Sequence, residues 1–215
     1  MAKKRKPEAP IGLNKFLTSD EERRFMEYMV SVSGDEGGVQ NCLIFDLMLQ
    51  TGLRVSELCG LRAKDTPKYL GANAIHVHES KGQKSRDIPI SDRLAARLSD
   101  YLKNYRPATL PQTVRASDRR KQVFYSALKQ PYKRAAIAHK LKKFTLLAGL
   151  DKHVTPHMTR HTFATLSLFE NRLNTKQLQA LLGHSKLATT EMYLYPVGLL
   201  NPEFGNNLDR GRWVY

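Results

Sequence analysis

Apolar residues recur every three or four positions through most of the chain, and this spacing predicts a fold built mainly of α-helices. The first helix is expected directly after Thr18, where Thr18 and Glu21 form a capping box ahead of an apolar stripe. Further helices are predicted over residues 39–50, 55–60, 92–104, 131–148, 156–170, 175–182 and 189–195. Gly52 and Gly149 are natural stops for two of them.

Two short stretches instead favour extended structure. Residues 74–79 and 86–90 are expected to be strands, and the polar run 80–85 joins them into a β-hairpin. Residues 106–122 are polar and basic, which predicts a surface loop, and 123–125 are expected to form a short strand. The predicted fold class is therefore mostly α with a small antiparallel β-sheet.

Length and composition narrow the class of protein. A chain of 215 residues, 41% of them hydrophobic, is long enough for one sizeable globular domain. No apolar run of transmembrane length exists, and the basic start lacks the apolar core of a secretory signal. Cys42 and Cys59 lie among apolar residues, which is typical of reduced core thiols in a cytoplasmic protein.

The chain carries a formal net charge of +15, from 35 basic and 20 acidic residues. A domain this basic usually has a polyanionic partner, and its basic residues are spread along the whole chain. Composition alone does not separate DNA from RNA or from an anionic membrane surface. Residues 1–15 are expected to be a basic flexible tail, either simply solubilising or lying as an arm on nucleic-acid phosphates.

Segments rich in Arg, Lys, His and Tyr are candidates for chemistry, although each has an ordinary structural interpretation when taken alone. They are residues 51–58, 80–84, 157–164, 182–184 and 189–193. His157 and His161 are one helical turn apart and could bind zinc, but the glutamate that completes a zinc-protease helix is missing between them. His76 and His78 share one strand face, which favours a solvated surface. We therefore expect no metal and no cofactor.

Three motifs within these segments indicate a protein family. They read Thr-Gly-Leu-Arg-x-Ser-Glu-Leu, His-x-x-Arg-His-Thr-Phe-Ala, and Leu-Gly-His-Ser followed by Thr-Thr-x-x-Tyr. In this order they resemble the tyrosine recombinase family, also called the phage integrase family, over Phe16 to Pro196. The resemblance implies the fold of DNA breaking-rejoining enzymes, with a catalytic domain over residues 16–196. It implies site-specific cleavage and rejoining of DNA through a 3′-phosphotyrosyl intermediate, for integration, excision or inversion.

The same resemblance assigns the site residues. The implied catalytic set is Arg54, Lys81, His157, Arg160, His184 and Tyr193. Glu57 matches an acidic position that supports the site, and His161 matches a motif position regarded as structural. The implied partners are double-stranded DNA and further copies of the chain, as a homodimer or homotetramer on DNA. This leaves room for accessory DNA-bending proteins and implies a cytoplasmic, nucleoid-associated location without a membrane partner.

The chemistry suits these residue types. Two arginines can bind the non-bridging oxygens of a phosphodiester and stabilise the charge of its transition state. A free tyrosine has a pKa near 10, so about one in a thousand is ionised at pH 7. Neighbouring cations and a base such as neutral His157 ease that ionisation, and Lys81 is a candidate acid for the departing 5′ oxygen. His184 is expected to hydrogen-bond the phosphate.

Two other functions stay open. One is a degenerate recombinase that binds DNA without cutting it, and the intact catalytic set argues against it. The other is a type IB topoisomerase, and the Leu-Gly-His-Ser segment with the motif spacing favours a recombinase instead. A plasmid-relaxation assay separates recombinase from topoisomerase.

The chain departs from the family pattern at its start. A helical core-binding domain usually precedes the catalytic domain, whereas residues 1–15 are all that precede it here. We expect a stand-alone catalytic domain, either natural, as in the small fimbrial phase-variation invertases, or truncated. Pro196 is expected to end the helix of the nucleophile. The apolar tail over 197–215 is expected to dock on a neighbouring protomer, the alternative being its own domain.

Overall fold

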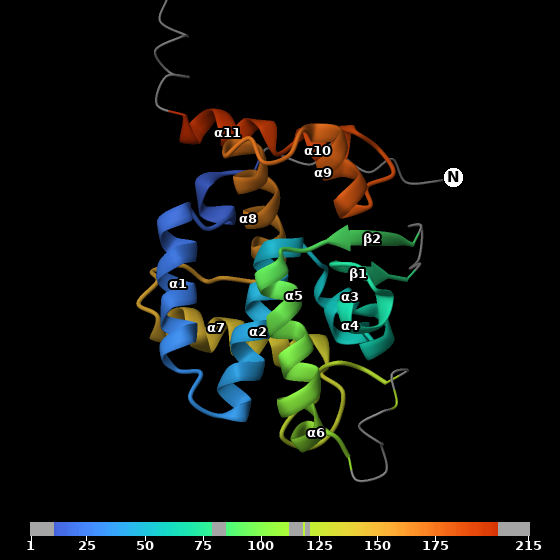
Figure 1. Cartoon of the computed structure of the whole chain (residues 1–215). Coiled ribbons are helices and arrows are strands. Elements are labelled where there is room, and N and C mark those ends of the chain that lie inside the picture. The colour runs from blue at the N-terminus through green and yellow to red at the C-terminus, as the bar shows by residue number, and fades with distance from the viewer. Residues whose placement is uncertain (1–10, 79–84, 112–117, 119–120, 202–215) are drawn as a thin grey trace, which may run out of the picture.

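The computed structural model describes residues 11–78, 85–111, 118 and 121–201 (Figure 1). Its longer helices are α1 (Ser19–Ser31), α2 (Glu36–Thr51), α5 (Asp92–Asp100), α7 (Arg134–Leu147), α8 (Pro156–Phe169) and α9 (Thr175–Leu182). Its shorter helices are α3 (Val55–Gly60), α4 (Pro67–Leu70), α6 (Arg106–Thr109), α10 (Ala188–Glu191) and α11 (Leu194–Leu200). Single turns at Leu13–Lys15 and Ala63–Asp65 and a π-helical turn at Tyr101–Tyr105 complete the helical part.

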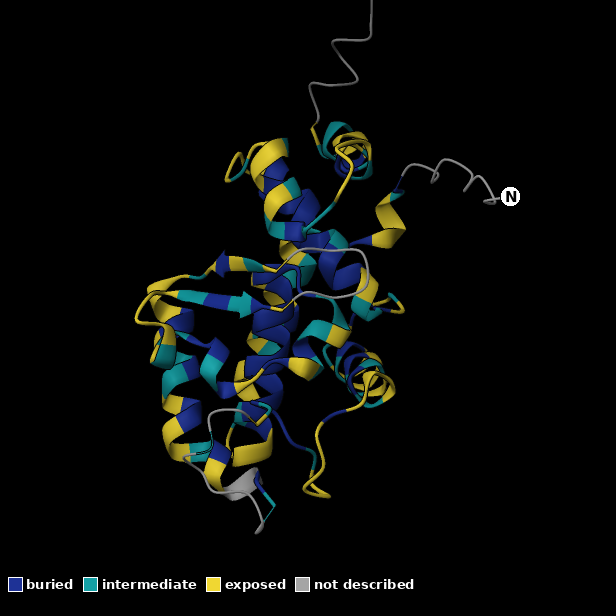
Figure 2. Cartoon of the chain, turned by 90° about the vertical axis from the view of Figure 1, so that its right-hand side faces the viewer, coloured by how far each residue is buried: buried dark blue, intermediate teal, exposed yellow. Residues whose placement is uncertain are grey.

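Helix α2 is the centre of the main hydrophobic core. Its apolar residues occur on all sides, so it is buried along nearly its whole length, as expected for a helix without a polar face. Helices α1, α5 and α8 pack around it, and Phe45 of α2 meets Phe25 of α1 and Phe144 of α7. Buried residues run through the middle of the molecule, with exposed residues on the outer helices (Figure 2).

The predicted start of α1 is confirmed. The Thr18 hydroxyl accepts from the Glu21 backbone N–H, and the Glu21 carboxylate accepts from the Thr18 N–H at 2.8 Å. Phe25 and Met29 are fully buried, whereas Val30 is 53% exposed, so the apolar stripe is narrower than predicted.

The predicted hairpin is confirmed in its described part. Strands β1 (Ala74–Val77) and β2 (Arg86–Pro89) pair antiparallel, with His76 opposite Asp87. The turn that carries Lys81 lies outside the described residues. The described part of the chain is therefore mostly helical with one two-stranded antiparallel sheet, as expected from the sequence. Cys42 and Cys59 are free thiols.

A second, smaller hydrophobic cluster lies at the end of the molecule formed by α9, α10 and α11 (Figure 1). Its buried members are Ile11, Phe16, Phe163, Ala164, Leu168, Leu178, Leu182 and Tyr193. Helix α8 contributes to both clusters, since Met158 in its first turn belongs to the main core. The candidate site residues on α8 therefore lie between the two clusters.

The predicted surface loop over residues 106–122 is wrong at its start. Arg106 begins α6 and is 1% exposed. Its Nε and Nη2 atoms donate to the Gln122 carbonyl at 3.0 and 2.9 Å, so the buried guanidinium has backbone acceptors. The strand expected over 123–125 is also wrong, because the structure has an isolated bridge there between Tyr125 and Pro131.

The helix predicted over residues 189–195 is only partly confirmed, because a turn at Met192 and Tyr193 interrupts it. The chain forms α10, leaves helical structure near Tyr193, and forms α11 from Leu194 onward. Pro196 lies in the first turn of α11, where a missing N–H costs no helical hydrogen bond, so it does not end the helix. Val197 and Leu200 pack against the smaller cluster of their own domain, and residues 202–215 lie outside the described part.

No helix among the described residues is both long enough and apolar enough to cross a membrane.

Candidate active site

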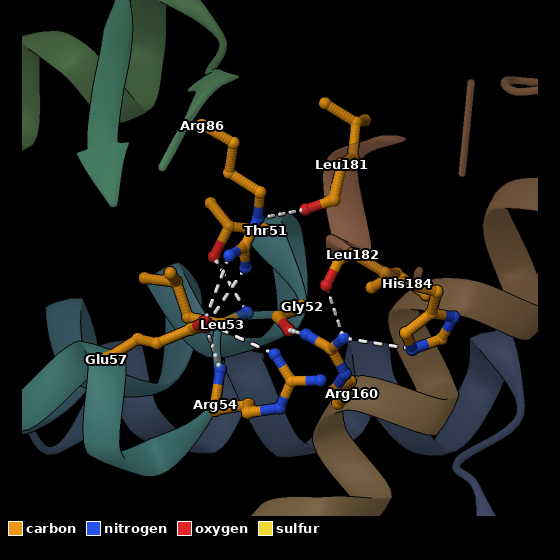
Figure 3. A network of polar contacts seen from close by, with 10 residues as sticks. All are labelled: Thr51, Gly52, Leu53, Arg54, Glu57, Arg86, Arg160, Leu181, Leu182 and His184. Atoms are coloured by element: carbon orange, nitrogen blue, oxygen red, sulfur yellow. Dashed lines mark hydrogen bonds and ion pairs between the residues drawn. The ribbon is translucent and has the colours of Figure 1, made fainter. Parts of the chain in front are cut away.

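The structure brings four of the predicted catalytic residues to one place, although they are far apart in sequence. Arg54 precedes α3, Arg160 lies on α8, His184 follows α9, and Tyr193 lies between α10 and α11. Figure 3 shows the two arginine guanidinium groups side by side, with His184 beyond Arg160. Lys81 is outside the described residues.

The turn that presents Arg54 depends on Gly52. Gly52 ends α2 with φ +61° in the left-handed region, which glycine adopts without strain. A Cβ atom built on Gly52 would lie 2.4 Å from Cδ1 of Phe163, closer than real contacts allow. Glycine is therefore required twice here, for its backbone angle and for the close approach of α8.

Arg160 is fixed by backbone carbonyls. It is 3% exposed, and its Nη1 donates to the Gly52 carbonyl while Nη2 donates to the Leu182 carbonyl, both at 2.7 Å (Figure 3). Burial, followed by the like charge of Arg54, lowers the pKa of Arg160 to about 10. The guanidinium thus stays charged at pH 7 and joins the end of α2 to the end of α9.

Glu57 organises the other arginine. Its Oε2 accepts from the Arg54 backbone N–H at 2.8 Å, and its Oε1 lies 3.3 Å from Arg54 Nη1. Burial alone would raise the pKa of the Glu57 carboxyl, but hydrogen bonds and charge from Arg86, followed by contacts with Arg54, outweigh it and lower the pKa. Glu57 is thus a charged carboxylate with a side chain only 5% exposed.

Arg86 was missed in the sequence and is a central residue of this network. Its Nη1 and Nη2 donate to the two carboxylate oxygens of Glu57, each at 3.0 Å. The strand pattern held a signal for it, because Arg86 and Ile88 share a face of β2 and Ile88 is buried. An arginine on the inner face of a strand is expected to bind a buried carboxylate or carbonyl group.

His184 is held between two partners. Its Nε2 lies 3.1 Å from Arg160 Nη2, and its Nδ1 lies 2.9 Å from the Thr190 hydroxyl oxygen. Arginine has no acceptor, so His184 Nε2 accepts from Arg160. The ring proton is therefore on Nδ1, which donates a hydrogen bond to the Thr190 hydroxyl oxygen. Burial, followed by the charge of Arg160, lowers the pKa of His184 to about 4. The ring is therefore neutral at pH 7.

Tyr193 is buried, at 2% exposed, between two imidazoles. Its hydroxyl lies 3.1 Å from Nδ1 of His161, and its ring is parallel to that of His184 at a centroid distance of 6.5 Å. Burial, followed by the charges of His157 and Arg160, lowers the pKa of His161 to about 4. His161, which was assigned a structural role, is thus the histidine that contacts the proposed nucleophile.

His157 lies one turn before His161 on α8 and is exposed. The two rings meet edge to face with centroids 4.9 Å apart. Within the described ranges, no three His, Cys, Asp or Glu side chains gather in a way that would hold a metal ion. The site as described therefore offers one buried and one half-buried arginine, neutral imidazoles and a tyrosine hydroxyl, which suits a phosphate anion and an oxygen nucleophile.

Comparisons with known proteins agree on one family. The sequence profile of the Phage integrase family matches residues 15–196. Tyrosine recombinase XerD of Lacticaseibacillus casei is 38% identical over 158 residues, covering 74% of this chain and 51% of that protein. The chain spans about half the length of several of the curated relatives it matches.

Solved structures give the same fold. The crystal structure of XerA recombinase aligns with a TM-score of 0.71 at 28% identity, covering 98% of this chain and 68% of that one. XerH site-specific recombinase, bound to its palindromic difH substrate after cleavage, aligns with a TM-score of 0.73 at 23% identity. This second alignment covers 92% of this chain and 54% of XerH, and it bears on the fold alone.

Proposed function

Because the chain belongs to the phage integrase family of tyrosine recombinases, we propose that it cleaves and rejoins DNA strands through Tyr193. The observation that carries the proposal is the meeting of Arg54, Arg160 and His184 beside that tyrosine. Residues 16–196 form the proposed catalytic domain. The basic tail predicted over 1–15 is wrong at its end, because Ile11 is buried in the smaller cluster and Leu13–Lys15 form a helical turn.

The proposed reaction is a transesterification in which every bond broken is matched by one formed. The Tyr193 oxygen attacks the phosphorus, the bond to the 5′ oxygen breaks, and a 3′-phosphotyrosine forms. The leaving 5′ oxygen takes a proton, for which Lys81 is the proposed general acid. A 5′ hydroxyl then attacks the phosphotyrosine and restores the DNA, so the energy of the phosphodiester is conserved without ATP.

The arginines supply the electrostatic part of this reaction. Arg160 is already fixed by the Gly52 and Leu182 carbonyls, so little reorganisation is needed when a phosphate arrives. Arg54 is oriented by Glu57. His184 is neutral, and its Nε2 accepts from Arg160 while its Nδ1–H is bound to Thr190. To hydrogen-bond a phosphate oxygen, as we propose, the ring must exchange tautomer so that Nε2 carries the proton and donates it to that oxygen.

We assign removal of the tyrosine proton to His157, assisted by the nearby arginines. His157 is exposed at the edge of the site, whereas the buried His161 bonds the hydroxyl directly. With its pKa at about 4, His161 is a poor acceptor for a proton from a phenol of ordinary pKa near 10. His161 is therefore kept out of the proposed acid–base set.

The proposed partner is double-stranded DNA, bound by a homodimer or homotetramer that pairs two sites. The net charge of +15 supports a polyanionic partner, and XerH was crystallised with a DNA substrate. Accessory DNA-bending proteins and the part of the tail that follows α11 are proposed to take part in assembly, in the cytoplasm on nucleoid DNA. The outcome on paired sites is integration, excision or inversion.

The test is to trap the covalent intermediate. The substrate is a pool of nicked suicide duplexes with randomised arms. Cleavage near the nick releases a short fragment that carries the 5′ hydroxyl, so the strand is not rejoined. We expect a protein–DNA band on a denaturing gel, and sequencing of the trapped DNA gives the site. Tyr193→Phe removes the nucleophilic oxygen alone, so this variant should bind DNA and form no adduct. A persistent adduct in Tyr193→Phe would remove Tyr193 from its role, and relaxation of plasmids that lack the site would indicate a topoisomerase.

A further inference from the structure

Arg86 joins three elements of the site, and none of the three motifs contains it. Its two terminal nitrogens bind Glu57 of α3, and its Nε donates to the Leu181 carbonyl at the end of α9 at 2.6 Å (Figure 3). The arginine itself is on β2, directly after the hairpin turn. Its side chain is 9% exposed, so these contacts are made away from solvent.

The site is built closely around this guanidinium. A Cβ atom on Gly183 would lie 3.2 Å from Arg86 Nη1, tighter than most real contacts. Gly183 also has φ +68°, in the left-handed region that favours glycine. The end of α9 thus approaches Arg86 at Gly183, which has no side chain. The next residue along the chain is His184.

Glu57 is shared unequally between two arginines. Arg86 binds both carboxylate oxygens at 3.0 Å in the two-point geometry that a planar guanidinium makes with a carboxylate. The side chain of Arg54 reaches Oε1 at the longer distance of 3.3 Å. Arg86 therefore balances most of the buried negative charge, and Glu57 holds the guanidinium of Arg54 less closely than that of Arg86.

On the basis of the recombinase function proposed above, we propose that Arg86 is a positioning residue for Arg54. By occupying both oxygens of Glu57, it fixes the carboxylate that orients Arg54. It also prevents the carboxylate from drawing the Arg54 guanidinium away from the phosphate. Arg86 itself contacts no reacting atom in this scheme.

Removing the guanidinium should therefore affect cleavage more than DNA binding. In Arg86→Met the buried Glu57 carboxylate would be left to Arg54, which would then be shared between Glu57 and the DNA phosphate. A further change of Glu57→Gln removes that competition, because the amide carries no charge and its oxygen can still accept from the Arg54 N–H. The double variant should thus be faster than Arg86→Met alone.

The experiment measures single-turnover cleavage of the trapped suicide substrate at saturating protein, together with the Kd for the same DNA. We expect Arg86→Met to cleave about 10- to 100-fold more slowly with a Kd changed less than about threefold, the scale of a misplaced catalytic group. The double variant should recover at least about fivefold of that loss. A substrate with a 5′-bridging phosphorothiolate, whose sulfur leaves without a proton, should not restore Arg86→Met.

Arg106→Met is the matched control. Arg106 is also a buried arginine that donates through Nε to a backbone carbonyl, but it lies in α6 and binds the Gln122 carbonyl, away from the site. This variant should lower the thermal midpoint and leave cleavage at the wild-type rate below that midpoint.

Four results would overturn the inference. The first three are a wild-type cleavage rate for Arg86→Met, an equal slowing by Arg106→Met, and no faster cleavage when Glu57→Gln is added to Arg86→Met. The fourth is rescue of Arg86→Met by the phosphorothiolate, which would mean that Arg86 supports the general acid Lys81 and not Arg54. Failure of the wild-type protein to form any adduct is a different result, because it refutes the proposed function itself.

Discussion

The Tyr193 hydroxyl lies 3.1 Å from Nδ1 of His161, so the proposed nucleophile is engaged in a hydrogen bond. A phenol is a good donor and a neutral imidazole nitrogen a good acceptor, so Tyr193 is assigned as the donor. Because the proposed base is His157, the proton must leave this bond before His157 can take it. The bond therefore stabilises the state before attack.

Replacing His161 tests that relationship. His161→Leu removes the acceptor, and the loss of one hydrogen bond of about 1 kcal/mol should speed single-turnover cleavage by up to about fivefold. His161→Asn keeps a polar atom near the position of Nδ1 and should behave like the wild type. Slowing of His161→Leu by more than about fivefold would show that the imidazole takes part in the attack.

The two arginines should differ in their effect on stability. Arg54→Ala and Arg160→Ala should each slow cleavage at least about 100-fold, the usual result of losing one transition-state donor. Arg160→Ala also leaves the Gly52 and Leu182 carbonyls without its donors, which should cost about 1–3 kcal/mol of unfolding free energy. Urea unfolding compares the two variants, and equal stability would mean that water replaces the lost donors.

Gly52 and Gly71 separate steric clash from backbone strain. Both have φ above +60°, but a Cβ atom on Gly71 meets nothing within 4 Å, whereas on Gly52 it meets Phe163 at 2.4 Å. Gly71→Ala should cost about 1 kcal/mol, the strain of a left-handed alanine. Gly52→Ala should cost at least about 2 kcal/mol more, the scale of an overpacked core. Chemical denaturation of both variants gives the difference, and equal losses would disprove the clash.

Acid should destabilise the fold through His161 and His184. Each has a folded pKa of about 4 against an ordinary 6.5, so between these values the unfolded chain binds more protons. Their contribution is complete above about pH 6.5 and is lost as the pH falls towards 4. Burial raises the pKa of Glu22 to about 7, which acts in the opposite direction over the same range.

The experiment therefore uses Glu22→Gln as the background. We expect its thermal midpoint to fall by at least about 3 °C between pH 7 and pH 5. Adding His161→Gln and His184→Gln should flatten this dependence. A midpoint that stays constant in the Glu22→Gln background would mean that the two imidazoles accept protons in the folded state.

Local rules predicted the elements that are determined locally. Helix α9 was predicted with its observed bounds, because Asn174 caps its start and Gly183 ends it in the left-handed region. Arg106 could not be predicted in the same way, since its burial depends on the carbonyl of Gln122 in a distant segment. The break near Tyr193 was also missed, because Pro196 is as compatible with the start of a helix as with its end.

The site divides along the same line. The motifs indicated Arg54, Arg160, His184 and Tyr193, and the structure brings these four together. Arg86 and His161 depend on which side chains face each other after folding. A motif records residue types along the chain, whereas the contacts of Arg86 with Glu57 and of His161 with Tyr193 join segments that the motif treats separately.

Arg160 spans the boundary between the two hydrophobic clusters. One of its nitrogens is bound to the Gly52 carbonyl beside the main core, and the other to the Leu182 carbonyl in the smaller one. A displacement of α9–α11 by the length of one hydrogen bond would release this guanidinium and move His184 and Tyr193 with it. The geometry of the site therefore depends on how α9–α11 pack against α8.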